Sequence, residues 1–246
     1  MRILTSLLLL AIINISYAQT IHYFRVQMGP KMENYKVLNN DNVKALSHVD
    51  VGAGLLVGKR FTENFYAEAG VFKNDYSAKF EITTKNQDGI ELKSFSDQLY
   101  PTFSTAQAGI FGGYRSEYSE KWTWYAQGGV QSTLTKKLER EGSQFFYEIA
   151  KNEASGDEEQ IEVITFSNGL GPGNLIFRAD AGLYRSVSEH LAIDMSVSGR
   201  FSNLVFNEFE IEYFSQSEPQ KKRAVLQNNA KSFSFSIGLK YKINDY

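Results

Sequence analysis

The chain has 246 residues and a formal net charge of -2, with 26 Lys and Arg against 28 Asp and Glu. This near-neutral balance argues against a nucleic-acid-binding protein, which usually carries a basic face. The sequence contains no cysteine, which excludes disulfides, thiolate metal sites and a cysteine nucleophile. Only 4 prolines stand beside 14 tyrosines and 18 phenylalanines, a composition that favours β-strands over disorder.

The first 18 residues have the three parts of a secretory signal peptide. Met1-Arg2 is a short basic start, residues 3–15 are mostly apolar, and Ser16-Tyr17-Ala18 is a small-x-small ending. The apolar run is shorter than the roughly 20 residues that a spanning helix needs. We therefore predict Sec export with cleavage after Ala18, which leaves residues 19–246 as the mature domain.

The C-terminal segment shows the clearest alternation of apolar and polar residues. Every second residue from Phe233 to Ile243 is apolar, and serine, glycine and lysine lie between them. A helix would scatter both sets around its circumference, so the segment is predicted to be a strand. The same pattern predicts eight strands in all, at residues 24–28, 49–58, 65–71, 106–115, 122–131, 175–184, 191–200 and 232–243.

The connections between the predicted strands alternate in length. The short ones are residues 62–64, 116–121 and 186–190, and the long ones are residues 29–48, 74–102, 136–174 and 202–231. Short periplasmic turns at one end and long extracellular loops at the other are the layout of outer-membrane barrels. Within the loops, residues 145–149 and 161–164 are predicted to pair as a hairpin. A change of face around Lys73 to Tyr76 indicates a bulge or an exit from lipid.

The polar face of the predicted strands carries many charged side chains. In a soluble barrel such a face meets water, whereas in a membrane barrel it fills the lumen and the apolar face meets lipid. Eight strands leave an interior just wide enough for side chains. Because unpaired charges there are costly, a salt-bridged plug is favoured over a narrow ion path. The predicted lumen network is Arg25, Asp50, Glu68, Arg115, Arg178, Asp180, Asp194, Arg200 and Lys240.

Aromatic residues gather near the short connections, where the girdle of a membrane barrel lies. The predicted girdle is Phe61, Phe65, Tyr114, Trp122, Trp124, Tyr184 and Tyr241. An even strand count also allows closure, so that no strand edge is left unpaired in lipid. These observations predict an all-β protein, an eight-stranded antiparallel up-and-down transmembrane β-barrel with long extracellular loops and short periplasmic turns.

The last predicted strand carries a recognisable spacing. Ser236, Gly238, Tyr241 and Ile243 follow the order polar, x, Gly, x, x, aromatic, x, hydrophobic. This resembles the barrel-assembly signal, although the final aromatic residue is offset because three residues follow Ile243. Through pattern rather than identity, the mature chain resembles the small eight-stranded bacterial outer-membrane β-barrel family. Within it, the chain is similar to the OmpA-transmembrane and OmpX type and to the porin-family "outer membrane protein beta-barrel domain" of Bacteroidota.

The resemblance implies a place in the outer membrane of a Gram-negative cell envelope and a non-enzymatic surface or interaction role through the loops. Its implied partners are outer-membrane lipid, lipopolysaccharide, the barrel-assembly machinery and an unknown extracellular partner. We expect a monomer without a cofactor, a metal or a nucleic-acid partner.

Three other functions stay open. One is a narrow porin-like solute channel, and another is a soluble periplasmic lipocalin-like binder with its apolar faces turned inward. The third is a barrel enzyme, a lipid hydrolase or protease. His48 and Asp50 share one face of the second predicted strand, as do the His/Asp pairs with which barrel proteases activate water. A lone pair of this kind is more simply a polar contact at the rim, so we predict no enzyme.

Overall fold

Eight strands of the computed structural model close into an antiparallel barrel. The structure describes residues 21–40, 42–95, 103–138, 144–168, 175–202, 205 and 207–243, and the predicted signal peptide lies outside them. The barrel strands are β1 (Tyr23–Glu33), β4 (His48–Arg60), β5 (Phe65–Tyr76), β8 (Phe103–Ser119), β9 (Trp122–Leu138), β12 (Leu175–Ser186), β13 (Leu191–Phe201) and β16 (Ser232–Lys242). No helix long and apolar enough to cross a membrane occurs among the described residues.

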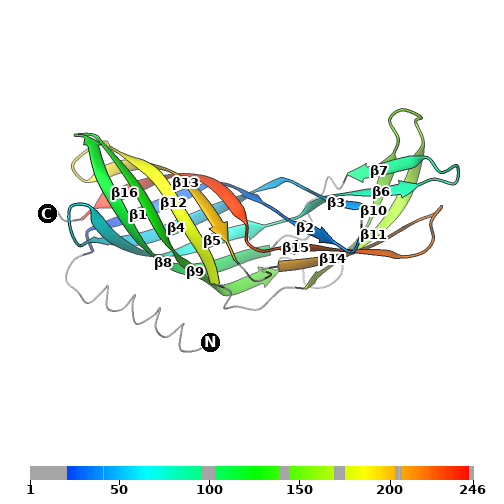
Figure 1. The fold of residues 1–246 in the computed structure, drawn as a ribbon, viewed down its shortest axis with the longest axis horizontal. Helices are drawn as coiled ribbons and strands as arrows, with labels where there is room; N and C mark the ends of the chain where they lie inside the picture. Colours follow the sequence, from blue (N-terminus) through cyan, green and yellow to red (C-terminus); the bar gives the residue numbers. More distant parts are fainter. Residues whose placement is uncertain are drawn as a thin grey trace.

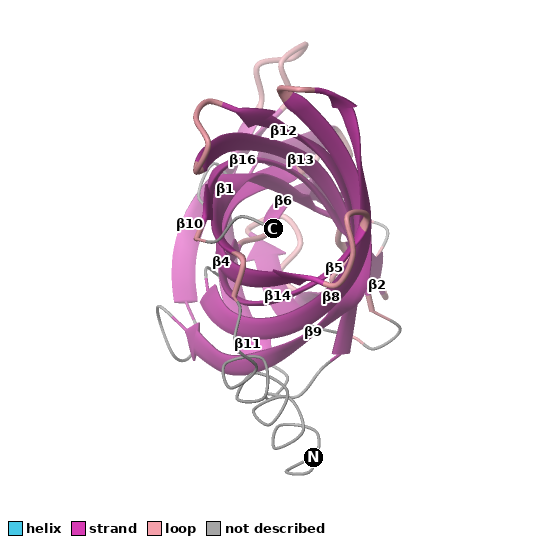
Figure 2. Cartoon of the chain, turned by 90° about the vertical axis from the view of Figure 1, so that its left-hand side faces the viewer, coloured by secondary structure: helices cyan, strands magenta, loops and turns pink. Residues whose placement is uncertain are grey.

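The barrel is closed because β1, the first strand of the sheet, also pairs with β4, the last. The order is β1-β16-β13-β12-β9-β8-β5-β4, and β1 is hydrogen-bonded to β16 on one side and to β4 on the other. Figure 2 looks into this ring from the end that carries the short turns. The eight barrel strands match the eight predicted ones, the last of which was predicted to run one residue beyond β16, so the prediction of an eight-stranded antiparallel barrel is confirmed.

The barrel turns its apolar side chains outward. On β16, every second residue from Phe233 to Tyr241 is apolar and between 41% and 53% exposed, whereas Ser234, Ser236 and Lys240 between them are buried. A closed ring with an apolar outside and a polar inside is the arrangement of a transmembrane barrel. The lipocalin-like alternative required apolar side chains inside this barrel and is wrong, because charged and polar side chains occupy that interior.

Eight further strands lie in the four long connections. They are β2 (Lys36–Leu38), β3 (Val43–Leu46), β6 (Lys79–Lys85), β7 (Glu91–Phe95), β10 (Gln144–Lys151), β11 (Glu158–Asn168), β14 (Asn207–Ser215) and β15 (Lys222–Asn228). They form a second sheet, here called the extension, in the order β2-β15-β14-β11-β10-β7-β6-β3. The predicted hairpin is confirmed as β10 and β11, in which Phe145 lies opposite Ile164.

The extension repeats the strand order of the barrel. Each of its strands precedes or follows one barrel strand along the chain, and neighbours in the barrel lead to neighbours in the extension. Figure 1 shows the extension projecting from one end of the barrel, opposite the short turns. Its two edge strands, β2 and β3, are separated along the chain only by residues 39–42, so the sheet curls back on itself.

The inside of the extension is an apolar core. Its members are each no more than 4% exposed and come mostly from seven of the eight extension strands, with Tyr76 of β5, Ile176 of β12, Ala78 and Ala230 added. They include Val43, Phe80, Ile82, Leu92, Ala150, Ile161, Val163, Phe209, Ile211, Tyr213, Ala224 and Leu226. These strands were not predicted as a sheet because most of them are short and only the β10–β11 pair and β14 alternate clearly.

Where the chain passes from the barrel into the extension, the same alternate residues continue to point inward. From Tyr66 to Tyr76 in β5 the even-numbered residues other than Gly70 are buried, and so are Phe80 and Ile82 in β6. The pairing of β5 with β8 is unbroken, so the predicted bulge is absent from this described stretch. What changes near Lys73 is the chemistry of the outward positions, because the Lys73 side chain is 68% exposed and forms an ion pair with Asp75.

Candidate functional site

The barrel lumen is the region where charged side chains converge. Alternate residues of each strand point inward, and all nine residues of the predicted lumen network lie there, between 0% and 8% exposed. They come from seven strands, and β9 adds Tyr125, Gln127 and Gln131. The interior is therefore dense with polar groups, and its chemistry depends on how these groups are paired.

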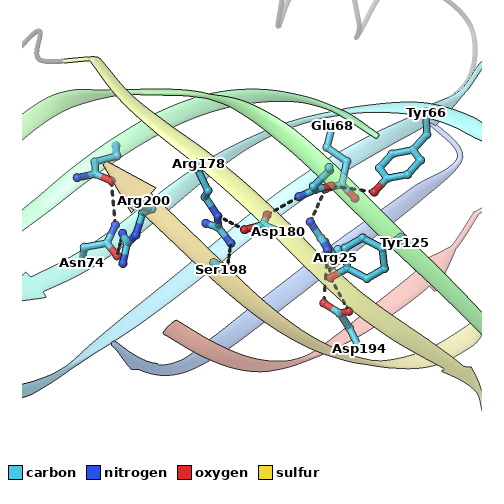
Figure 3. Close-up of polar contacts among 12 residues, drawn as sticks. Arg25, Tyr66, Glu68, Asn74, Tyr125, Arg178, Asp180, Asp194, Ser198 and Arg200 are labelled. Carbon is cyan, nitrogen blue, oxygen red and sulfur yellow. Dashed lines mark hydrogen bonds and ion pairs between the residues drawn. The ribbon is translucent and has the colours of Figure 1, made fainter. Parts of the chain in front are cut away.

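Arg25 is the centre of the network near the short turns. Its guanidinium forms an ion pair with Glu68, donates a hydrogen bond of 2.8 Å to the Tyr125 hydroxyl, and lies 3.5 Å from an Asp194 carboxylate oxygen. The Tyr125 hydroxyl donates to the other Asp194 oxygen at 2.9 Å. Figure 3 shows these contacts between β1, β5, β9 and β13. One guanidinium thus contacts two buried carboxylates on distant strands.

Tyrosine rings complete this cluster. The Lys240 ammonium lies 3.6 Å from the ring centroid of Tyr23 and 3.9 Å from that of Tyr184. The Tyr23 hydroxyl donates to Glu68 at 2.8 Å. A buried ammonium over aromatic faces gains cation–π stabilisation that partly replaces its lost hydration.

Tyr184 corrects the predicted girdle. It is 4% exposed and stacks on Tyr125 inside the lumen, with ring centroids 4.5 Å apart. Tyr184 keeps the inward parity of Arg178 and Asp180 on the same strand, so it cannot reach the lipid face. Of the other predicted girdle residues, Phe61, Phe65, Tyr114, Trp124 and Tyr241 are 38% to 61% exposed at the short-turn end, and Trp122 is half-buried.

Glycines make the room that these rings need. A Cβ atom at Gly58 would overlap the Tyr23 ring, and one at Gly113 would overlap Tyr66. A Cβ atom at Gly182 would likewise overlap the Tyr125 ring. Substitution at any of the three would displace a buried ring, since rings packed in a full lumen have no space to move into.

A second group of contacts lies in the middle of the lumen. The Arg178 guanidinium donates to Asp180 at 2.6 Å and to Ser198 at 3.1 Å, and the Gln127 amide donates to Asp180 at 2.6 Å. Arg200 donates to the Asn74 side-chain oxygen at 2.8 Å. Figure 3 shows the contacts of Arg178 with Asp180 and Ser198 and that of Arg200 with Asn74. The middle of the lumen is therefore filled by one ion pair, the Arg200 guanidinium and a set of amide and hydroxyl groups.

A third group, at the extension end, contains two residues that were not in the predicted network. Lys31 and Glu33 form a buried ion pair of 2.9 Å, and the Lys31 ammonium also donates to the Asp75 carbonyl oxygen at 2.7 Å. The first predicted strand stopped at Met28 because Gly29-Pro30 interrupts the alternation. The polar parity of Arg25 and Gln27 nevertheless continues to Lys31 and Glu33, and this was the signal available in the sequence.

His48 and Asp50 lie close together but are not arranged with Ser77 as a catalytic triad. The His48 Nε2 atom is 3.4 Å from an Asp50 oxygen, and the hydroxyl and amide of Ser77 both donate to Asp50. In a Ser-His-Asp triad the histidine lies between serine and carboxylate and accepts the serine proton. Here the carboxylate lies between them, so His48 is not placed to accept the Ser77 proton. No group of three or more His, Asp or Glu suited to a metal occurs among the described residues.

Three residues of the predicted assembly signal lie on the two faces of β16, and the fourth, Ile243, directly follows the strand. Ser236 is buried in the lumen, whereas Tyr241 and Ile243 face outward and are 52% and 38% exposed. A Cβ atom at Gly238 would overlap the β1 backbone at Val26. Glycine is therefore required here by the close approach of the strands that close the barrel.

Two cavities interrupt the lumen packing. One of about 20 Å³ lies among Gln27, Lys31, Asn74, Arg178 and Arg200. The other, of about 60 Å³, lies at the short-turn end among Arg60, Arg115, Glu117 and Lys240. A wider recess of about 820 Å³ shares Arg60, Arg115 and Glu117 with this cavity and is also lined by Glu63.

The chain is similar in three dimensions to several solved structures. The outer membrane protein OprG from Pseudomonas aeruginosa is 11% identical, with 91% of this chain and 97% of that chain covered and a TM-score of 0.49. Neisserial surface protein A is 10% identical, with 89% and 97% covered and a TM-score of 0.43. Ail, the attachment invasion locus protein of Yersinia pestis, is 11% identical, with 91% and 100% covered and a TM-score of 0.34. No protein-family model and no curated protein sequence matches the chain.

Proposed function

We propose that this protein is a non-enzymatic bacterial outer-membrane protein whose plugged barrel anchors the extension on the outside of the cell, where the extension contacts a partner. The observation that carries this proposal is the extension itself. It continues the barrel strands in the same order and has its own apolar core. A barrel that served only as a pore would have no need of a folded second sheet.

The contents of the lumen support an anchor rather than a channel. Arg25 joins β1 to Glu68 on β5 and to Asp194 on β13, so its contacts cross the path that a solute would take. Moving these groups aside would leave buried charges unpaired, which costs several kcal/mol. Beyond the lumen, the apolar core of the extension would meet the solute next.

The outer face of the extension supports a contact role. Phe145, Tyr147 and Ile149 on β10 and Phe95 on β7 are each between 51% and 55% exposed. We call these four side chains the apolar stripe. Lys93 and Lys151 are paired across the two strands and face the same way, so the stripe ends in charged side chains. Contiguous exposed apolar side chains on a part of the protein that meets water mark surfaces that bind a partner. We propose a partner with an apolar surface, and lipopolysaccharide around the barrel.

Conductance of the purified protein in planar lipid bilayers tests the anchor against the channel. We expect no current above that of the bare bilayer. To show that the barrel is folded, the same sample should migrate faster unboiled than boiled in SDS, as closed barrels do until heated. Stable single-channel steps from a sample that passes this gel test would replace the proposal with the porin-like alternative.

Labelling of single cysteines in intact cells tests the orientation. The chain has no native cysteine, so Ser155→Cys in the β10–β11 turn and Ser188→Cys in the β12–β13 turn provide a matched pair of exposed positions. A membrane-impermeant maleimide is expected to label the first in intact cells and the second only after the cells are broken. The reverse pattern would place the extension in the periplasm and remove the surface role.

A further inference from the structure

Arg200 is a buried cation whose charge is not neutralised by the side chains around it. It is 6% exposed, and its guanidinium donates one hydrogen bond, to the neutral Asn74 amide. Within the described part of the chain, no carboxylate lies within 4.0 Å of it and no aromatic ring lies beneath it. Arg25, Arg178 and Lys31, by contrast, each form an ion pair. Leaving a buried charge in this state is strongly unfavourable.

The cavity of about 20 Å³ adjoins this guanidinium. Arg178 and Lys31 also line it, together with Gln27 and the hydroxyl-bearing Ser234 and Ser236. A volume of this size holds one particle as large as a water molecule. Three cations thus surround a space for one small solute, and only two of them have a carboxylate partner.

Other nearby carboxylates are already engaged. Glu33 pairs with Lys31 and also accepts a hydrogen bond from Asn228. Asp50 accepts two hydrogen bonds from Ser77 and lies 3.4 Å from His48. Neither carboxylate contacts Arg200, so among the described residues its guanidinium has no negatively charged partner.

One more lining group has a free hydrogen-bonding atom. The Oε1 atom of Gln27 is buried and has no hydrogen-bond partner. Gln27 lines the cavity, and its amide can turn about its last bond without breaking a hydrogen bond at Oε1, so it can offer its NH₂ group as a donor. The serine hydroxyls can rotate in the same way, so the lining can offer donors from several sides.

We propose that this cavity binds one small monovalent anion, such as chloride, which supplies the negatively charged partner that Arg200 lacks. The site uses cations from three strands, β1, β12 and β13, and hydroxyls from β16. The bound anion would join these strands across the barrel. Its binding to the folded barrel alone would stabilise that state.

Refolding the full-length barrel in detergent with different sodium salts tests the site. The protein is refolded in chloride or in gluconate at equal ionic strength, since gluconate is too large for the cavity. The thermal midpoint is then read from the loss of the fast-migrating unboiled band. We expect the midpoint to be about 2–4 °C higher in chloride, the shift that about 1 kcal/mol produces in a chain of this size. Arg200→Gln should abolish the difference between the salts.

A matched control and a direct readout complete the test. Arg223→Gln removes an exposed cation of the extension, one paired with Glu210, and should retain the full chloride effect. Crystals of the wild-type protein refolded in bromide should show an anomalous peak in the cavity, which decides the question even if Arg200→Gln does not fold. Equal midpoints in both salts, or a cavity that holds water without an anomalous peak, would overturn the proposal.

Discussion

The barrel and the extension are two sheets with the same strand order and opposite chemistry. In the barrel, Arg25 and Asp194 are fully buried while Ile237 and Leu239 are more than half exposed. In the extension, Ile161 and Leu226 are fully buried, while outward positions such as Glu162 and Glu212 are charged. The difference shows that burial inside a curled sheet does not select apolar residues by itself. The medium outside decides: lipid draws the apolar face outward, and water drives it inward.

The reversal runs along single strands, without a break in their geometry. From β15 into β16 the even-numbered inward positions change from Ala224 and Leu226 to Ser232, Ser234 and Ser236. The alternation of inward and outward positions is thus continuous, while the type of residue at these positions changes with the medium outside the sheet. The proposed outer surface of the membrane lies where this change occurs.

Removing Arg25 should produce the largest effect on the barrel. Arg25→Met leaves Glu68 and Asp194 buried without their cation, which should lower the free energy of unfolding by about 3–5 kcal/mol. Urea titration followed by the fast-migrating unboiled band in SDS measures this change. The matched control is Arg223→Met, an exposed cation of the extension, which should change stability by less than about 0.5 kcal/mol. Equal stability of the two variants would mean that the lumen network is not what holds the barrel.

The same substitution at two equally exposed isoleucines should distinguish a side chain that faces lipid from one that faces water. Ile237 in the barrel is 52% exposed and Ile149 in the extension is 54% exposed. Ile237→Arg places a charge in the apolar band, near its middle, and should cost about 2–4 kcal/mol. Ile149→Arg places it in water and should cost less than about 0.5 kcal/mol. Similar costs in the same urea titration would show that the band does not face lipid.

Replacing the apolar stripe should weaken surface contact without affecting the fold. The triple change Phe145→Ser, Tyr147→Ser and Ile149→Ser removes three exposed apolar side chains, each worth up to about 1.5–3 kcal/mol when buried by a partner. Partition of expressing cells into hexadecane is expected to fall about tenfold. The control replaces Glu208, Glu210 and Glu212 with serine on the neighbouring outer face and should leave partition at least as high. If the two triple variants partition alike, the stripe is not a contact surface.

The smallest expected effect is a pH dependence from His22 at the short-turn end. Burial, with the charges of Arg60 and Lys59 nearby, lowers the pKa of the His22 imidazole below its ordinary value of 6.5. Its neutral Nδ1 atom accepts a hydrogen bond of 2.9 Å from the Arg60 backbone amide. Because the unfolded chain takes up the proton more readily, the contribution of His22 is complete above pH 6.5 and is lost as the pH falls through the lowered pKa.

Urea midpoints between pH 8 and pH 5 measure this dependence. The slope that His22 adds is at most about 1.4 kcal/mol per pH unit. His22→Asn keeps an acceptor near the Nδ1 position but cannot titrate, so the variant should lose stability less steeply below pH 6.5 than the wild type. Since His48 and His190 are present in both proteins, their contributions cancel in the comparison. Parallel curves would contradict the assignment.

Much of the barrel can be predicted from the sequence, because a strand that lies between lipid and a polar lumen must alternate between apolar and polar residues. This is why the pattern from Phe233 to Ile243 identifies a strand, and why Arg25, Glu68 and Asp194 could be grouped by their shared polar face alone. Tyr184 shows that nearness to the short turns is a weaker signal than parity, since an aromatic residue there fits both the girdle and the lumen. Its parity with Arg178 and Asp180 is visible in the sequence and agrees with its place inside the barrel.

The tertiary structure alone decided which polar residues meet and what the long connections become. Arg25 lies 43 residues from Glu68 and 169 from Asp194 in the sequence, and only the closure of the barrel brings the three together. Short strands such as β2 and β3 have too few residues to show an alternation of apolar and polar residues. They form because the order of the barrel strands places their pairing partners beside them. Local alternation reflects the medium on each side of a strand, whereas pairing across the barrel depends on register and closure.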